Sequence, residues 1–353
     1  SGEAYPELVD KQDYIFKILS IEENSFYKTI DKGMEILKED MEEMKAAGET
    51  VMSGEKSFRL YDTYGFPVDL TKEILEEAGM TMDKEGFDAA LEVQRKMARE
   101  ARNDKEGRPV VYNTSGINVA ELKVDEAATE AKIVKMYPAH NAQPIENAAD
   151  GTDVAVICDV TAFHAEGGGQ LGDIGTITAP TGVIAVNVTK KLPDGAVIMI
   201  GSVTEGTVVV GDAVTFAVDK ARKMDIARNH TATHLLHAAL KQVLGAHVNQ
   251  AGSYVGPDRL RFDFSHFSQV TAEELKKVEA IVNEQVLAGK AVNIEELPIE
   301  EAKKKGATAL FGEKYGNIVR VVTVPDFSME FCGGSHVSNT AQIGMFKIVS
   351  EGS

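Results

Sequence analysis

Two short motifs, His230-x3-His234 and Cys332-x3-His336, constrain the fold of this chain more than any other feature of its sequence. Apolar residues at helical spacing, without Gly or Pro, surround the first motif over 226–244, so we expect a helix there. Histidines four residues apart share one face of a helix. The second motif adds a thiolate and a third imidazole, a ligand set that favours tetrahedral zinc. We therefore predict that the fold brings both motifs together around one zinc ion.

The type of metal site stays open between two arrangements. Four protein ligands form the closed arrangement of a structural site, whereas a hydrolytic zinc usually keeps one position for water. We favour zinc that positions the substrate or stabilises an oxyanion over zinc hydroxide as nucleophile. The first motif differs from the metalloprotease helix, because Thr231 stands where that helix has its general-base glutamate. His237 lies on nearly the same helical face and is either a substitute ligand or, as we expect, a packed side chain.

The composition is that of an ordinary globular protein, with 353 residues, 43% hydrophobic and 26% charged. No apolar run approaches the roughly 20 residues that span a bilayer, and no signal-peptide pattern begins the sequence. Two cysteines give no disulfide framework, which fits a reducing compartment. We therefore expect a cytoplasmic protein without a membrane partner.

The formal net charge of -18 argues against an indiscriminate nucleic-acid binder, because phosphate binding depends on lysine and arginine. Basic residues nevertheless gather in two regions, each of which fits a solvated surface as well as RNA contact. The proximity of the second region to the histidine motif favours RNA contact. The two groups are Arg95, Lys96, Arg99 and Arg102, and Lys220, Arg222, Lys223, Arg228, Arg259 and Arg261.

Residues 1–105 are predicted to form a mostly helical domain. An apolar stripe at helical spacing over 26–44 predicts a long helix whose stripe packs into a core. The run 58–70 breaks this pattern, and we expect an apolar strand or turn there before the next helix. Asp83 is expected to cap a further helix that runs to about Arg102. The polar, Gly- and Pro-containing segment 103–109 is predicted to be the linker.

The remainder of the chain is predicted to form two further regions, giving an α+β fold overall. In 106–219, short apolar runs separated by Gly, Asp and Pro turns predict a small β-barrel. In 220–353, helices alternate with strand-like runs and predict an α/β sandwich that holds the zinc. The expected elements of this last region include a helix over 271–288 and strands over 318–324 and 344–349.

The run 163–175 contains Gly167, Gly168 and Gly169, followed by Gln170. Consecutive glycines let the backbone approach a ligand closely, but no Gly-Lys-Ser/Thr follows, so this is not an ATP loop. A tight hairpin would also explain the glycines. We favour a loop that cradles a substrate, because the sequence also carries the zinc motifs.

Several of these runs resemble bacterial alanyl-tRNA synthetases. Segments 230–237, 260–266 and 331–336 are similar to the editing domain of that family, as is the glycine-rich run, where the family commonly has tyrosine at the position of His164. Segments 2–8 and 60–70 resemble the family's tRNA-recognition region. The resemblance covers essentially the whole chain, without the class II aminoacylation core or the C-terminal dimerisation region.

The resemblance implies a helical tRNA-recognition domain, a glycine-rich barrel subdomain and a zinc-binding editing core. It implies hydrolysis of serine and glycine esters of tRNA(Ala), with one Zn2+ per chain and ATP used only by the missing core. A pocket for alanine rejects glycine or serine poorly, so a second hydrolytic site is needed. The competing hypothesis is a zinc-structured tRNA-binding module without hydrolytic activity. A free-standing editing protein would not need residues 1–105.

The resemblance also suggests roles for single residues. Gln250 matches a glutamine of the editing pocket, whose amide can donate to and accept from a serine hydroxyl, although an exposed turn residue is the alternative. Thr231 and Thr233 offer hydroxyl groups to the site or pack within their helix. Asp62 either helps to recognise the G·U pair of the acceptor stem or caps a turn. Candidate substrate or RNA contacts are Gly167, Gly168, Gly169, Gln170, Asp62, Arg228 and Arg261.

Overall fold

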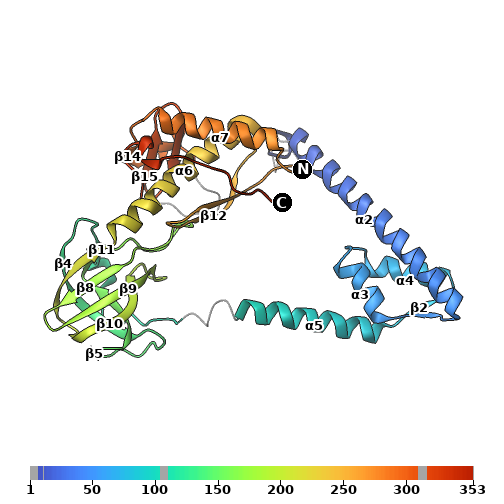
Figure 1. Ribbon diagram of the computed structural model, residues 1–353, viewed down its shortest axis with the longest axis horizontal. Coiled ribbons are helices and arrows are strands. Elements are labelled where there is room, and N and C mark those ends of the chain that lie inside the picture. The colour runs from blue at the N-terminus through green and yellow to red at the C-terminus, as the bar shows by residue number, and fades with distance from the viewer. Residues whose placement is uncertain (1–6, 11, 104–109, 309–315, 353) are drawn as a thin grey trace. The chain divides into compact units, whose positions relative to one another are not determined.

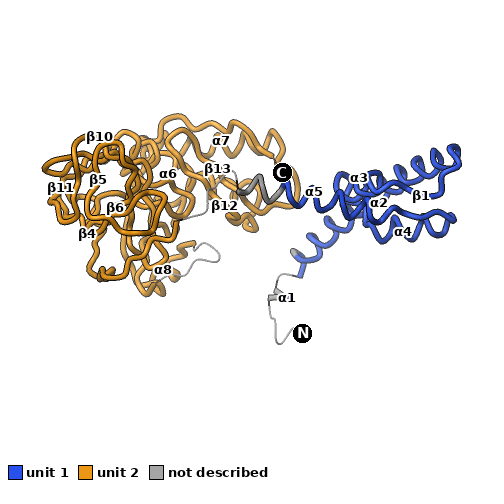
Figure 2. Tube along the Cα trace, turned by 90° about the horizontal axis from the view of Figure 1, so that it is seen from below, with its two compact units in different colours: residues 1–109 blue, residues 110–353 orange. Residues whose placement is uncertain are grey.

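The computed structural model describes residues 7–10, 12–103, 110–308 and 316–352. The chain forms two compact units, residues 1–109 and 110–353 (Figure 2). Each unit has a hydrophobic core of its own. Most of the predicted linker, residues 104–109, lies outside the described residues.

The first unit is built mostly from helices, as the apolar spacing predicts (Figure 1). Leu37, Leu60 and Leu75 are fully buried in its core. The prediction that the whole apolar stripe of the long helix packs inward is wrong at Phe26, which is exposed, because the core reaches only as far as Ile30. The elements are α1 (Glu7–Asp10), α2 (Gln12–Ala47), β1 (Val51–Met52), α3 (Gly54–Asp62), α4 (Val68–Glu77), β2 (Thr81–Met82) and α5 (Lys84–Asn103).

The strand or turn expected at the start of 58–70 is wrong, because helix α3 occupies this position. The Ser53 side chain accepts a hydrogen bond from the Lys56 backbone N–H (3.3 Å) and caps the helix. The helix buries Leu60 in the core, so tertiary packing decides the conformation of an ambiguous apolar run. The cap of α5 is confirmed, since Asp83 Oδ1 accepts from the Gly86 backbone N–H (2.9 Å).

The second unit begins with a barrel of six antiparallel strands, which confirms the predicted β-barrel. The strand order is β10-β6-β4-β11-β8-β9, and β9 pairs with β10 to close the ring. A short strand, β5, adds to β10, and β3 pairs with β7 in parallel. The bounds are β3 (Lys123–Val124), β4 (Glu130–Pro138), β5 (Asn147–Ala149), β6 (Asp153–Cys158), β7 (Val160–Thr161), β8 (Gly175–Ala179), β9 (Gly182–Lys191), β10 (Val197–Val209) and β11 (Ala213–Val218), with a 3-10 turn, η1, at Val119–Glu121.

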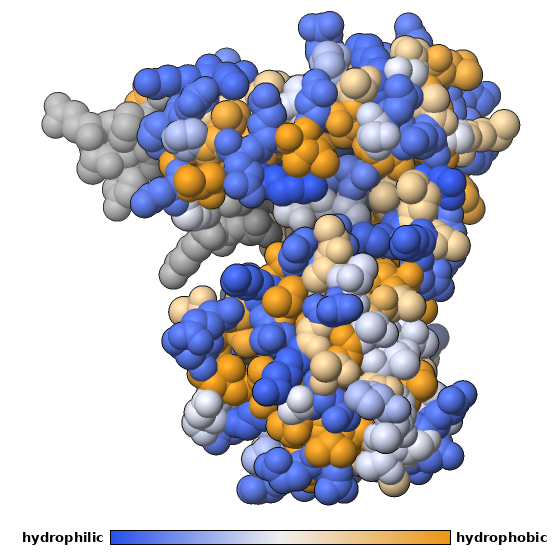
Figure 3. All heavy atoms as spheres, turned by 90° about the vertical axis from the view of Figure 1, so that its left-hand side faces the viewer, coloured by the Kyte–Doolittle hydropathy of each residue, from blue (hydrophilic) through white to orange (hydrophobic). Residues whose placement is uncertain are grey.

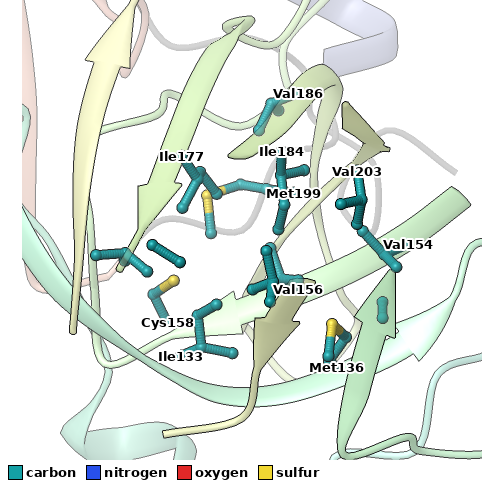
Figure 4. Close-up of a cluster of buried hydrophobic side chains, with 14 of the residues drawn as sticks. Ile133, Met136, Val154, Val156, Cys158, Ile177, Ile184, Val186, Met199 and Val203 are labelled. Atoms are coloured by element: carbon teal, nitrogen blue, oxygen red, sulfur yellow. The ribbon is translucent and has the colours of Figure 1, made fainter. Parts of the chain in front are cut away.

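Apolar side chains fill the barrel, as expected where alternate residues of each strand face inward. Ile133, Val156, Ile184 and Met199 are fully buried and point toward one another from four strands (Figure 4). Cys158 belongs to the same cluster and is a free cysteine. The barrel therefore has a packed interior of its own.

The C-terminal part of the second unit combines helices with two small sheets (Figure 1). Helices α6 and α7 pack together, and their core includes Leu235, Val278, Val282 and Val322. The bounds are α6 (Lys220–Leu244), β12 (Gln250–Val255), β13 (Leu260–Phe264), α7 (Ala272–Leu287), β14 (Asn293–Pro298), α8 (Ile299–Lys304), β15 (Ile318–Val324), β16 (Ser328–Phe331) and η2 (Thr340–Ile343).

Two predictions for this part differ from the structure. Helix α6 begins earlier than residue 226, because the Asp219 carboxylate caps it by accepting from the Arg222 N–H (2.9 Å). No strand forms over 344–349. The side chain of Asn283, on α7, forms hydrogen bonds with the backbone of this segment instead. Its Nδ2 donates to Phe346 O and its Oδ1 accepts from Phe346 N, both at 2.9 Å.

The surface carries mixed hydrophilic and hydrophobic residues over the face of the molecule that Figure 3 shows. None of the helices in the described ranges is long and apolar enough to cross a membrane.

Helix α7 starts with a reciprocal cap that gives a testable prediction. The Thr271 hydroxyl accepts from the Glu274 backbone N–H (3.2 Å), and the Glu274 carboxylate accepts from the Thr271 N–H (2.8 Å). Thr271→Ala is expected to lower the free energy of unfolding by about 1 kcal/mol, because it removes the side-chain half of this capping box. Denaturant unfolding measures this change. Thr271→Ser keeps the hydroxyl as a control, and an equal loss in both variants would contradict the capping role.

Candidate metal centre

The two motifs that dominate the sequence meet in the second unit, as predicted. Helix α6 carries His230 and His234, and the turn after β16 carries Cys332 and His336. One ligand atom from each of these four residues lies within 4.8 Å of all the others. The imidazole centroids of His336 lie 4.4 Å from His230 and 4.6 Å from His234. This grouping is the one that a tetrahedral metal site requires.

The thiol of Cys332 is at the centre of the cluster. Its Sγ lies 3.3 Å from His230 Nε2 and 3.3 Å from His336 Nε2. Burial alone would raise the pKa of Cys332, but the charge of His230 and the close contacts with the surrounding imidazoles hold this pKa well below its usual range. Burial, aided by the charges of His234 and His230, lowers the pKa of His336 to about 3. A thiolate and a neutral imidazole are the protonation states that bind metal.

The hydrogen bonds of Thr231 determine which nitrogen of His336 carries the proton. The Thr231 hydroxyl donates to Ala227 O (2.9 Å) and accepts from the Val337 N–H (3.2 Å). Its one proton is therefore used, so at its 3.1 Å contact with His336 Nδ1 it must accept. Nδ1 of His336 is protonated, and Nε2, which faces Cys332, has a free lone pair for a metal.

The buried carboxylate of Glu330 lies beside two histidines of helix α6, His234 and His237. Glu330 Oε1 lies 2.9 Å from His237 Nδ1, and its Oε2 lies 3.9 Å from His234 Nδ1. Burial opposes the charge of Glu330, but the charge of His234 and a hydrogen bond from His237 lower the pKa of this carboxyl. His237 packs on Phe262, with ring centroids 5.1 Å apart, as expected for a packed side chain rather than a ligand.

Arg320 holds the turn that carries Cys332 through the backbone carbonyls of that turn. Arg320 Nη1 donates to the carbonyls of Cys332 (2.7 Å) and Gly334 (2.8 Å). Gly334 lies against the His230 ring, where an added Cβ would be 2.1 Å from Cε1. The donor set, one thiolate with three imidazoles of which at least His336 presents Nε2, fits zinc. The residues that would hold the metal are His230, His234, Cys332 and His336.

A cavity of about 570 Å³ opens beside the cluster. His230, His234 and Cys332 form part of its wall. The barrel supplies another part of the wall, including Gly167 and Gly168 of the glycine-rich run. The cavity is of the size that binds small ligands.

Comparisons with known proteins show the family of this chain. A family model described as "tRNA synthetases class II (A)" matches residues 1–222, and one described as "Threonyl and Alanyl tRNA synthetase second additional domain" matches residues 319–353. The chain belongs to the class II (A) tRNA synthetase family. Both the first unit and the barrel lie within the first match, and Cys332 and His336 lie within the second.

Proteins of the same family that are named alanine–tRNA ligase are similar over nearly the whole chain. Identity is 50% with the protein of Thermoanaerobacter sp. (strain X514) over 99% of this chain, and 49% with that of Geobacillus thermodenitrificans over 98%. The Clostridioides difficile protein is 47% identical over 100% of the chain. The chain spans 40% of the length of each of these relatives.

The structure places some of the predicted synthetase site residues in the cavity wall and others elsewhere. Gln250 and Thr233 line the cavity, together with Gly167 and Gly168. Thr233 also donates its hydroxyl proton to Asn229 O (2.8 Å). Thr231 is fully buried behind His336, so its contact with the site runs through that histidine.

Five other predicted residues do not belong to the cavity wall. Gln170 is fully buried, with its side chain against His230. Arg228 is bonded to Asp225 and to Gln342 O, and Arg261 forms an ion pair with Asp263 (3.0 Å). Gly169 packs on Ser253, which an added Cβ would meet at 2.4 Å. Asp62 ends helix α3 in the first unit, where it is exposed.

Besides Glu166 of the glycine-rich run, sequence reasoning missed three charged residues of the cavity wall, Lys191, Arg320 and Glu330. Each lies on or at the end of a strand, β9, β15 or β16, whose alternation of side chains indicates burial but not a cavity. Of these strands, β16 was not expected at all. The nearest signal was the position of Glu330, two residues before Cys332.

Proposed function

We propose that this chain is the editing part of a bacterial alanyl-tRNA synthetase, which hydrolyses serine and glycine esters of tRNA(Ala) in the cytoplasm. The supporting observation is one cavity lined by the metal cluster, by Gln250 and by the glycine-rich run. Residues 1–105 would recognise tRNA, 106–219 would supply the glycine-rich barrel, and 220–353 would hold one Zn2+. The relatives are named alanine–tRNA ligase, which supports the choice of tRNA.

The cavity suits a charged tRNA end. Lys191 and Arg320 place two cationic groups in its wall, and phosphate binding depends on such groups. Gly167 and Gly168 have no side chain, so the backbone can approach a ligand there. Gln250 presents an amide that can donate to and accept from a serine hydroxyl.

Hydrolysis of the ester requires mainly that the ester and a water molecule are held in position. The oxygen of a water molecule attacks the ester carbonyl, the bond to the ribose oxygen breaks, and a proton from the water ends on that ribose oxygen. Bound zinc would supply positive charge beside the developing oxyanion. The residues of the chain would hold the ester and the water in attacking position, which accounts for much of the rate of such a step.

The test is hydrolysis of seryl-tRNA(Ala) and alanyl-tRNA(Ala) by this chain without ATP. We expect the serine ester to be cleaved well above the spontaneous rate, the alanine ester much less, and no response to added ATP. Binding of tRNA that weakens as salt rises, with no deacylation, would instead support the tRNA-binding module without hydrolytic activity.

Gln250→Ala is expected to slow serine removal about tenfold or more while leaving stability almost unchanged, because the amide contributes to the bound substrate rather than to the fold. Deacylation rates and thermal unfolding of the same preparation measure the two effects. Asn249→Ala is the control, since this neighbouring amide does not line the cavity. Equal losses of melting temperature and activity would assign Gln250 a structural role.

A further inference from the structure

Gln170 links the glycine-rich run of the barrel to the metal cluster. It follows the three glycines and is fully buried. Its Oε1 lies 2.6 Å from His230 Nδ1 and 2.8 Å from the backbone N of Ser335, and its Nε2 lies 3.2 Å from Ser335 Oγ. One side chain therefore contacts a metal-binding histidine of α6 and the turn that carries Cys332 and His336.

The proton on His230 follows from these three contacts. The Ser335 backbone N–H can only donate, so the Gln170 atom that faces it must be the carbonyl oxygen. The same oxygen faces His230 Nδ1, and because it has no proton to give, Nδ1 must donate to it. His230 Nε2 then has a free lone pair, and it lies 3.3 Å from Cys332 Sγ.

The backbone on both sides of Gln170 is fixed against strand β12. Val255 N donates to Gly169 O (2.7 Å), and Leu171 N donates to Val255 O (3.0 Å). Gly169 has a φ of 84° and no space for a side chain against Ser253. The backbone of Gln170 is therefore held in place, and the contacts with Ser335 hold its buried side-chain amide.

We propose that Gln170 is a positioning residue, which selects the His230 tautomer that presents Nε2 to the metal and thereby couples metal binding to the order of the glycine-rich run. The inference rests on the proposed zinc site. A partner on the far nitrogen fixes both the ring orientation and the tautomer of a metal-binding histidine. Because coupling between two events is reciprocal, metal on His230 also stabilises the run 163–173 against the cluster.

The deciding variants change the chemistry of Gln170 without changing its volume greatly. Gln170→Met has no group that accepts from His230 Nδ1, and zinc affinity, measured by chelator competition, is expected to fall about 10- to 100-fold. Gln170→Glu keeps an acceptor for His230 and for Ser335 N, while the Ser335 hydroxyl can turn to donate. Its zinc affinity is expected to stay within about threefold of the parent chain, because carboxylates are common hydrogen-bond partners of zinc-binding histidines.

Ser335→Ala is the matched control, because it removes one hydrogen bond of Gln170 but leaves the bond to His230. We expect its zinc affinity to be unchanged. Hydrogen exchange of residues 163–173 supplies a second measurement that does not depend on activity. Zinc should slow this exchange in the parent chain and in Ser335→Ala, and much less in Gln170→Met.

The proposal fails if Gln170→Met binds zinc as tightly as the parent chain, or if folded Gln170→Glu loses as much affinity as Gln170→Met. It also fails, whatever the variants do, if nitrogen NMR of the zinc-loaded parent chain shows His230 protonated on Nε2. A parent chain that binds no zinc would contradict the proposed metal site instead. The two failures are therefore distinguishable.

Discussion

Replacing Cys332 with alanine is expected to abolish stoichiometric zinc binding. The parent chain should carry about one zinc per chain, and the variant should lose more than about 100-fold in affinity, because a direct ligand contributes more than its hydrogen-bonding partners do. Zinc at roughly 100 times its Kd stabilises a folded protein by about 2.7 kcal/mol, and this contribution should vanish. Metal analysis and thermal unfolding with and without zinc measure the two effects, and deacylation should fall as well.

Cys158→Ala is the control for this experiment. Cys158 is the other cysteine of the chain and is buried in the barrel core, where burial raises the pKa of its thiol. Its replacement should lower stability slightly and leave zinc binding intact. Wild-type zinc content in Cys332→Ala, or loss of zinc in Cys158→Ala, would overturn the assignment of the ligands.

Replacing Gly334 with alanine is expected to damage the metal cluster without removing any ligand. An added Cβ would lie 2.1 Å from His230 Cε1, 2.3 Å from His230 Nδ1 and 2.6 Å from Gln170 Oε1. Relief of this overlap must displace the ring or the turn, at a cost of about 1–3 kcal/mol in unfolding free energy. Because the displaced atoms orient a ligand, zinc affinity should fall about 10- to 100-fold in chelator competition.

The neighbouring glycine provides a matched control. A Cβ on Gly333 would meet nothing within 4 Å, so Gly333→Ala should keep both the stability and the zinc affinity of the parent chain. Neither glycine is among those with positive φ, so backbone strain does not separate the two variants. Equal behaviour of Gly333→Ala and Gly334→Ala would show that the close approach to His230 has no effect on the metal site.

Secondary structure was predictable from the sequence where the apolar periodicity agrees with the positions of turn and cap residues. The barrel strands and helix α7 follow from alternating or helical apolar spacing between clear turn or cap residues, as in the Thr271 cap. The prediction failed over 58–70 and over 344–349, where short apolar runs fit either a helix or a strand. Packing of Leu60 decided the first case, and the bonds of Asn283 to Phe346 decided the second.

The sequence by itself predicted the candidate ligand set, because the spacing within each motif and the chemistry of His230, His234, Cys332 and His336 already favour one metal site. Only the tertiary structure decided which groups orient those ligands. Gln170 contacts His230 from the glycine-rich run, and Glu330, although it is two residues before Cys332, faces His234 of a helix that is distant in sequence, so local spacing alone predicts neither contact. A ligand set is a matter of local spacing and residue type, whereas hydrogen-bond partners depend on which distant backbone segments the packed core brings together.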